Sequence, residues 1–225
     1  MPGTTESEVV SQPRLRVSGV CDRLADAARW NKPPCKSVAN NMTCRFLLIG
    51  GSLRNDSTNA AVLRTVEALA PDSVTCVLYD GVGRIPPFNP DDDHDPLPSA
   101  VAELRDLVHR SDAIVLSTPE YAGALPGSLK NLLEWLIGDD KQGSIYEKPV
   151  AWVNASPRGA ALAHESLRTV LAYAKAKVIE AACLDVPVTA AALGEDGLVS
   201  DPGTRDQLRQ VAQTLSALAC SSQMA

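Results

Sequence analysis

Several features that mark common protein classes are missing from this 225-residue chain. No apolar run approaches the roughly twenty residues of a membrane span, and no apolar secretory segment follows the N-terminus, so we expect a cytoplasmic protein without membrane insertion. The formal net charge of −6 argues against nucleic acid as a partner. The six cysteines form no Cys-x-x-Cys pair and no cluster with histidine. This scatter predicts free thiols rather than disulfides or a metal site.

Motifs for the common nucleotides and for acid–base chemistry are also missing. There is no Gly-x-Gly-x-x-Gly for a pyrophosphate and no Gly-Lys-Ser/Thr for a nucleoside triphosphate. The acidic stretch 91–95 lacks the spacing of metal ligands, which predicts a solvated turn and no metal. His109 and His164 have no nucleophile or paired acid nearby in the sequence. We therefore predict no catalytic acid, base or nucleophile.

The chain divides into two parts of different character. Residues 1–43 contain turn formers, mixed charges and a proline pair, but no sustained periodicity. We expect them to form a disordered N-terminal extension that the protein can lose. Residues 44–225 form the expected domain.

Strands and helices alternate through the expected domain. Most strand candidates are continuous apolar runs, which is typical of strands covered on both faces. They lie at 45–50, 74–79, 113–118, 150–155 and 178–186. Segments with apolar residues at helical spacing follow each of them, and one contains Leu129, Leu132, Leu133 and Leu136. Strict alternation of five strands and five helices predicts a doubly wound parallel α/β sheet with helices on both faces.

A sheet of this type binds its ligand at the carboxyl ends of its strands. The first candidate loop follows the strand at 45–50 and offers hydroxyls, a guanidinium and an amide, from Ser52, Ser57, Thr58, Arg54 and Asn59. Such a set at the start of a helix suits a single terminal phosphate. Ser57 or Asp56 could instead only cap the helix, but capping does not explain Arg54.

The second and third candidate loops follow the third and fourth expected strands. Residues 118–131 hold two prolines, two glycines and Tyr121, which suit close approach to a flat ligand or a simple turn into a helix. Residues 154–159 suit either a ligand contact or a short connection. The sheet brings all three loops to one edge, and together they favour a ligand site.

Two long motifs resemble the NADPH-dependent FMN reductase family. They are Gly-Ser-Leu-Arg-x-x-Ser-x-Asn at 51–59 and Pro-Glu-Tyr-x-Gly-x-x-Pro-Gly-x-Leu-Lys-Asn at 119–131. The resemblance implies a flavodoxin-like, five-stranded sheet of order 2-1-3-4-5. It implies FMN as cofactor, NADPH or NADH as co-substrate, and hydride transfer to a flavin, quinone or similar small acceptor. It also implies a homodimer or homotetramer, and the apolar helix with Trp135 is a candidate interface.

The resemblance also assigns roles to residues. Ser52, Arg54, Ser57 and Asn59 would hold the FMN phosphate, and Pro119, Glu120, Tyr121 and Gly123 would line the ring, with Ser156 at its other edge. The predicted cofactor-binding set is Ser52, Leu53, Arg54, Ser57, Thr58, Asn59, Pro119, Glu120, Tyr121, Ala122, Gly123 and Ser156. Ala122 replaces the family's usual asparagine, and Ala160-Ala161 follow Gly159 where the family usually has a glycine pair.

Two other functions are compatible with parts of the pattern. A flavodoxin-type electron carrier has the same fold and cofactor but is not an enzyme. The Pro-Glu-Tyr loop of this chain matches the reductases better than it matches such carriers. A dinucleotide-binding dehydrogenase is disfavoured because the first loop lacks the required glycines.

Overall fold

The structure is a computed structural model that describes residues 43–54 and 56–220. The expected N-terminal extension, residues 1–43, lies outside the described residues except for Thr43. We therefore describe the domain alone.

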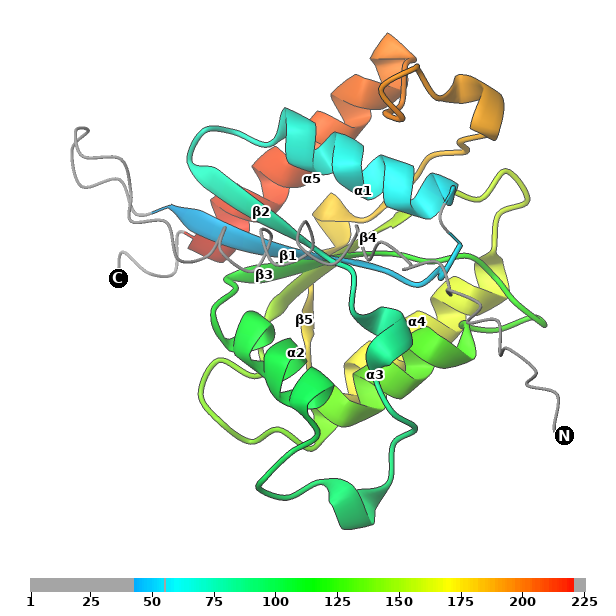
Figure 1. Cartoon of the computed structure of the whole chain (residues 1–225). Helices are drawn as coiled ribbons and strands as arrows, with labels where there is room; N and C mark the ends of the chain where they lie inside the picture. The colour runs from blue at the N-terminus through cyan, green and yellow to red at the C-terminus, as the bar shows by residue number, and fades with distance from the viewer. Residues whose placement is uncertain (1–42, 55, 221–225) are drawn as a thin grey trace, which may run out of the picture. The chain divides into compact units, whose positions relative to one another are not determined.

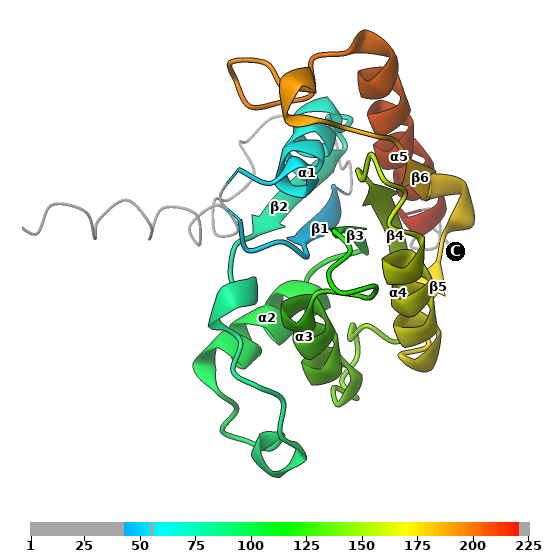
Figure 2. The same ribbon diagram turned by 90° about the vertical axis from the view of Figure 1, so that its right-hand side faces the viewer.

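One parallel sheet forms the centre of the domain, and its strands run in the order β2-β1-β3-β4-β5 (Figures 1 and 2). These strands are β1 (Cys44–Gly50), β2 (Val74–Tyr79), β3 (Ala113–Ser117), β4 (Pro149–Asn154) and β5 (Lys177–Val178). The order reverses direction at β1, next to β3, which is where ligands bind in doubly wound sheets. The predicted flavodoxin-like topology is confirmed.

The last strand differs from the prediction, because 178–186 is not one continuous strand. A 3-10 turn, η4 (Glu180–Ala182), separates β5 from β6 (Leu184–Asp185), and both short strands pair with β4. The interruption falls on Glu-Ala-Ala, residues that form strands poorly. The apolar run was therefore a poor guide to strand length here.

Helices cover both faces of the sheet, as predicted. In Figure 1, α1 (Thr58–Leu69) and α5 (Pro202–Cys220) lie on one side of it. On the other side lie α2 (Ser99–His109), α3 (Gly127–Ile137) and α4 (Ala161–Tyr173). Short 3-10 turns occur at η2 (Val82–Arg84), η3 (Pro90–Asp92) and η5 (Ala190–Ala192).

Alternating residues of β1 divide the apolar core into two halves. Phe46 and Leu48 pack with α1 and α5, whereas Leu47 and Ile49 pack with α2, α3 and α4. All four side chains are fully buried, which explains why the strand reads as a continuous apolar run. This core holds the strands in place, and with them the loops that follow the carboxyl ends of the strands.

The apolar face of α3 belongs to the second half of this core. Trp135 is 0% exposed, and its indole N–H donates to the carbonyl of Pro86 at 2.8 Å. The Trp135 side chain therefore packs within its own domain, and a subunit interface on the rest of α3 stays a prediction.

The prediction of free thiols is wrong for two of the cysteines. Cys44, the first residue of β1, forms a disulfide with Cys220, the last residue of α5, and their Cα atoms are 6.1 Å apart. Cys76 and Cys183 are free, and Cys76 is a buried core residue. The partners are 176 residues apart in sequence, so cysteine spacing could not indicate that folding brings them together.

Within the described part of the chain, we find no helix with both the length and the apolar character needed to cross a bilayer.

Candidate cofactor site

Three loops meet at the carboxyl edge of the sheet. They follow β1, β3 and β4 and span residues 51–57, 118–126 and 155–160. These strands are parallel neighbours, so their carboxyl ends lie side by side. All three loops leave the sheet on the right of Figure 1. The predicted convergence is therefore present, and hydrogen bonds link the loops as described below.

The first loop begins at a glycine that has no room for a side chain. The N–H of Gly51 donates to the carbonyl of Ser117 at 2.8 Å. A Cβ on Gly51 would lie 2.8 Å from the Cβ of Thr118 and 2.9 Å from Cδ2 of Leu129. Only glycine allows this close approach to the start of the second loop. Gly51 and Thr118 were absent from the predicted set, although Gly51 stands in the first motif.

The Ser57 hydroxyl and the Arg54 guanidinium make few hydrogen bonds within the described residues at the start of α1. Ser57 is the N-cap residue and is only 4% exposed, yet its side chain makes no capping hydrogen bond. The Arg54 guanidinium is exposed and contacts only the carbonyl of Asp56, at 3.5 Å, among the described residues. Ser57 thus occupies the N-cap position, as the alternative predicted, but its hydroxyl does not make the capping hydrogen bond.

Asn59, the second residue of α1, connects the start of that helix to the middle of the sheet. The Ser117 hydroxyl lies 3.0 Å from Oδ1 of Asn59 and 2.7 Å from the carbonyl of Val153, and it can donate to either. Both side chains are buried. The Asn59 carbonyl group thus faces Ser117, a contact between residues 58 positions apart in sequence. Ser117 was not predicted because its strand reads as apolar.

The second loop contains a tight hairpin at Tyr121–Ala124. The N–H of Tyr121 donates to the carbonyl of Ala124, and the reverse bond is equal at 3.1 Å. The central residues Ala122 and Gly123 both have positive φ, 50° and 73°, which is the pattern of a type I′ turn. Alanine is disfavoured in this conformation and asparagine is tolerated. This turn would suit the asparagine that the resemblance implies at position 122 better than it suits Ala122.

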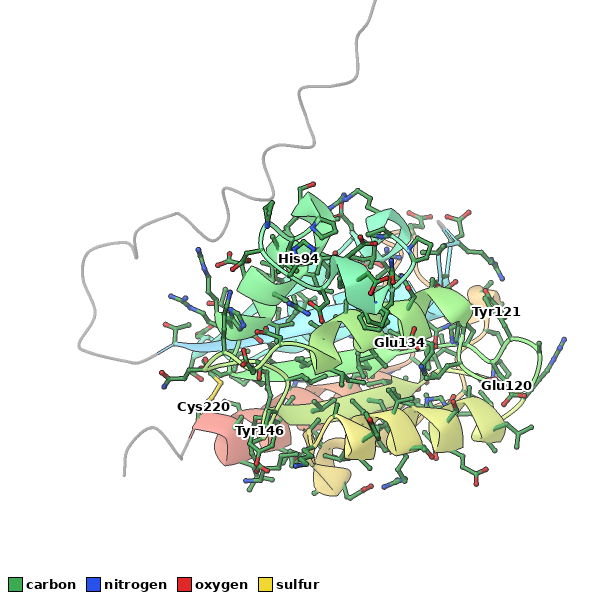
Figure 3. All side chains as sticks on the ribbon, turned by 90° about the horizontal axis from the view of Figure 1, so that it is seen from below. His94, Glu120, Tyr121, Glu134, Tyr146 and Cys220 are labelled. Atoms are coloured by element: carbon green, nitrogen blue, oxygen red, sulfur yellow. A yellow bond between two sulfur atoms is a disulfide. The ribbon has the colours of Figure 1, made fainter. Side chains whose placement is uncertain are left out.

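Two adjacent residues of the second loop point to different neighbours. The hydroxyl of Tyr121 lies 3.5 Å from the hydroxyl of Ser52 in the first loop. The carboxylate of Glu120 accepts the backbone N–H of Ala163 in α4 at 3.1 Å. Figure 3 shows Glu120 and Tyr121 together at one end of the domain, opposite Cys220 and Tyr146. The hairpin thus connects the first loop to α4.

The third loop is held by the side chain of Asn154. Its Oδ1 accepts the N–H of Ser156 at 3.1 Å, and its Nδ2 donates to the carbonyl of Gly159 at 2.5 Å. The Ser156 hydroxyl accepts the N–H of Arg158 at 3.2 Å. Ser156 is half-buried at the rim. Asn154 was not in the predicted set, although it ends the strand that leads into this loop.

A histidine–aspartate pair lies at the opposite edge of the sheet. The sequence offered no paired acid for His109, but its Nε2 lies 2.5 Å from Oδ2 of Asp139. The prediction that His109 has no paired acid is wrong. The ends of α2 and α3 lie next to each other and bring these two residues, 30 positions apart in sequence, together. Both helices lead into the amino ends of strands, so the pair is remote from the three loops.

The strand order and the loops at its carboxyl edge define a flavodoxin-like α/β protein. Residues 44–189 match the sequence profile of the family described as NADPH-dependent FMN reductase. The chain therefore belongs to this family, as its motifs indicated.

Three relatives agree with this assignment. A quinone reductase from Pseudomonas putida is 32% identical over 168 residues, which cover 72% of this chain and 87% of that protein. An NAD(P)H-dependent FMN reductase from Pseudomonas aeruginosa is 30% identical over 173 residues, 76% of this chain and 92% of that protein. Among solved structures, FerB, a flavoenzyme NAD(P)H:(acceptor) oxidoreductase from Paracoccus denitrificans, is 28% identical with a TM-score of 0.64, and the match covers 77% of this chain and 96% of that one.

Family membership decides between the functions that the sequence left open. The chain is an enzyme, an FMN-dependent oxidoreductase with NAD(P)H as electron donor. The electron carrier and the dinucleotide-binding dehydrogenase are no longer candidates.

Proposed function

We propose that the loop after β1 binds the phosphate of FMN, and that the enzyme reduces a quinone, a flavin or a similar small acceptor with electrons from NADPH or NADH. The observation that carries this proposal is Ser57, the N-cap residue of α1, which is only 4% exposed and whose hydroxyl makes no capping bond. A serine in this place with an exposed arginine three residues before it matches what a phosphate requires.

The phosphate-binding part of the site comprises Ser52, Arg54, Ser57, Thr58 and Asn59. The N–H groups of the first turn of α1 point out of the helix start, where the helix dipole adds partial positive charge. Arg54 adds a full charge and a forked set of donors. Within the described residues, Arg54 has no carboxylate partner that a phosphate would have to displace. The donor set therefore fits a phosphate.

The ring-binding part comprises Pro119, Glu120, Tyr121, Ala122, Gly123 and Ser156, with Leu53 at the rim. Tyr121 and Leu53 are 47% and 59% exposed, so each has apolar surface that a flat ligand would cover. FMN, when bound, supplies the hydride chemistry. The protein's own residues then have to bind and orient FMN and the substrates, and the scheme needs no side chain as acid, base or nucleophile.

The relatives support the choice of acceptor and donor. One is named a quinone reductase and another an NAD(P)H-dependent FMN reductase, so quinones and flavins are the acceptors to test first. The family description names NADPH. We propose NADPH as the donor to test first, with NADH beside it.

Three further proposals concern the whole protein. We propose a homodimer or homotetramer, because Leu53 and Leu162 leave apolar surface exposed around the site, at 59% and 55%. We propose a cytoplasmic location, where reduced nicotinamide nucleotides are regenerated. We also propose that residues 1–43 are a dispensable extension.

Steady-state kinetics test the proposed reaction. The protein saturated with FMN should oxidise NADPH or NADH rapidly when menadione or free FMN is present. Its rate without added acceptor should be much lower. A protein that binds FMN but gives no acceptor-dependent oxidation with either nucleotide would contradict the proposed reaction while leaving the cofactor site intact.

A further inference from the structure

Helix α4 begins without a capping side chain of its own. Its N-cap residue is Ala160, which has a left-handed conformation with φ 47° and no polar side chain. The first N–H groups of a helix have no partner within the helix, and an N-cap side chain usually accepts one of them from the second or third helical residue. An alanine leaves this position empty.

A carboxylate from the second loop occupies the position of the missing cap. Oε2 of Glu120 accepts the N–H of Ala163 at 3.1 Å, across 43 positions in sequence. Ala163 is the third residue of α4, where a local capping side chain would bind. The negative charge also lies at the positive end of the helix dipole. Glu120 therefore caps α4 from another loop.

This contact fastens the Tyr121–Ala124 hairpin to α4 on one side. Leu162 in the first turn of α4 lies next to the hairpin, since a Cβ added at Gly123 would lie 3.6 Å from Cδ1 of Leu162. On the other side, the Tyr121 hydroxyl lies 3.5 Å from the Ser52 hydroxyl of the first loop. The hairpin is thus held between α4 and the loop after β1.

We propose that Glu120 is a positioning residue: its carboxylate docks the hairpin on α4 and so sets the position of the hairpin relative to the phosphate-binding loop. This inference rests on the proposed function, in which FMN contacts both the hairpin and that loop. The Glu120 carboxylate acts through Ala163 and the hairpin, so only the backbone of Glu120 lines the ring, and the residue takes no part in electron transfer. The length of the side chain matters more than its charge, because the position of the hairpin depends on where the acceptor oxygen lies.

Three substitutions separate reach from charge. Glu120→Gln keeps an acceptor oxygen at the same reach without the charge, and Glu120→Asp keeps the charge but is one methylene shorter. Losing a hydrogen bond that positions the hairpin should raise the Kd for FMN at least about fivefold in Glu120→Ala and Glu120→Asp. Glu120→Gln should stay within about twofold of the unchanged protein. The measurement is FMN titration by isothermal calorimetry.

The spectrum of bound FMN provides a readout that a loss of stability alone would not move. At saturating FMN, the visible circular dichroism band of the flavin in Glu120→Asp should differ from that of the unchanged protein. The band in Glu120→Gln should be the same as in the unchanged protein. The matched control is Asp201→Ala, since the Asp201 carboxylate accepts the N–H of Thr204 at 2.7 Å at the start of α5. That helix lies on the opposite face of the sheet. The control should lower the melting temperature but change neither Kd nor spectrum.

The outcomes distinguish this inference from the proposed function. If the unchanged protein binds no FMN, the proposed function fails. If the unchanged protein binds FMN and Glu120→Asp binds it equally well with the same spectrum, only the positioning role fails. Weakened binding in Glu120→Gln equal to that in Glu120→Asp would also overturn it, because charge would then matter rather than reach. These two variants decide the question even if Glu120→Ala does not fold.

Discussion

Single residues at the start of α1 carry the proposed recognition of phosphate. Arg54 is exposed and free of carboxylates among the described residues, so its guanidinium can form charge-assisted bonds with a phosphate. We predict that Arg54→Ala lowers affinity for FMN at least about tenfold, since each such bond contributes roughly 1.5–3 kcal/mol. Affinity for riboflavin, which has no phosphate, should not change. Titration of both flavins measures the two effects.

An arginine on a neighbouring loop provides the control for Arg54. Arg158 is also exposed, but it follows β4 and is not part of the proposed phosphate-binding set. Arg158→Ala should leave affinity for FMN within about twofold, if binding depends on position rather than on general positive charge. Equal losses in the two variants would remove Arg54 from its proposed role.

Lys148 should make stability depend on pH. Its side chain is buried and its ammonium donates to the carbonyl of Ser111 at 2.5 Å. Burial lowers the pKa of Lys148 to about 8 from 10.5, and Asp112 offsets part of this effect. Below pH 8 both the folded and the unfolded chain bind the proton. Between pH 8 and 10.5 the unfolded chain binds more protons, so stability contributed by this residue rises with pH.

The comparison of the unchanged protein with Lys148→Met isolates this effect. Between pH 8 and 9.5, the free energy of unfolding of the unchanged protein should rise by about 1.5 kcal/mol relative to the variant. Buried Cys76 and half-buried Cys183, whose pKa values are raised by burial to about 12 and about 11, act equally in both proteins. Urea denaturation at each pH gives the difference. A constant difference across this range would show that Lys148 does not titrate as described.

At the scale of secondary-structure elements, the disulfide fastens the end of α5 to the start of β1. A cross-link between residues 176 positions apart restricts the unfolded chain strongly. Reduction should therefore lower stability by about 2–4 kcal/mol, or on the order of 10 °C in melting temperature. Thermal unfolding with and without dithiothreitol measures this shift.

The double variant Cys44→Ser, Cys220→Ser is the control for reduction. Its melting temperature should equal that of the reduced protein and should not respond to dithiothreitol. If dithiothreitol leaves the melting temperature of the oxidised protein unchanged, the cross-link does not contribute to stability. If thiol titration finds Cys44 and Cys220 reactive, the disulfide is not formed.

The sequence predicts elements best where burial alone shapes it. β1, β3 and β4 are buried on both faces and read as apolar runs, and Pro126 and Gly138 mark the two ends of α3. The last strand was overextended because Glu180–Ala182 turns away from the sheet although its neighbours are apolar. Local pattern thus indicates that an element exists more reliably than how far it extends.

Contacts across the sequence could not be predicted in the same way. The loops were found because strand ends meet at one edge in any parallel sheet. How they are fastened was not found, since Glu120 and Ala163 are 43 positions apart. At the opposite edge of the sheet, the pair of His109 and Asp139 was missed for the same reason, because they are 30 positions apart. No local pattern specifies such partners. The candidate site was therefore predictable as a set of loops but not as a network of hydrogen bonds.

At the scale of the whole molecule, the described core lies between Cys44 and Ala219. We predict that a protein lacking residues 1–41 folds, melts within a few degrees of the full chain and binds FMN with a Kd within about twofold of it. Thermal unfolding and FMN titration of both proteins test this. An insoluble product, or one without affinity for FMN, would give the N-terminal segment a role in the domain.

The most direct test of the central claim compares FMN with riboflavin on the unchanged protein. The two ligands share the ring and differ by the phosphate that we assign to the loop after β1. Several charge-assisted hydrogen bonds should make FMN bind at least about a hundredfold more tightly in calorimetric titration. Equal affinity for the two flavins, or no binding of FMN at micromolar concentrations, would contradict the account.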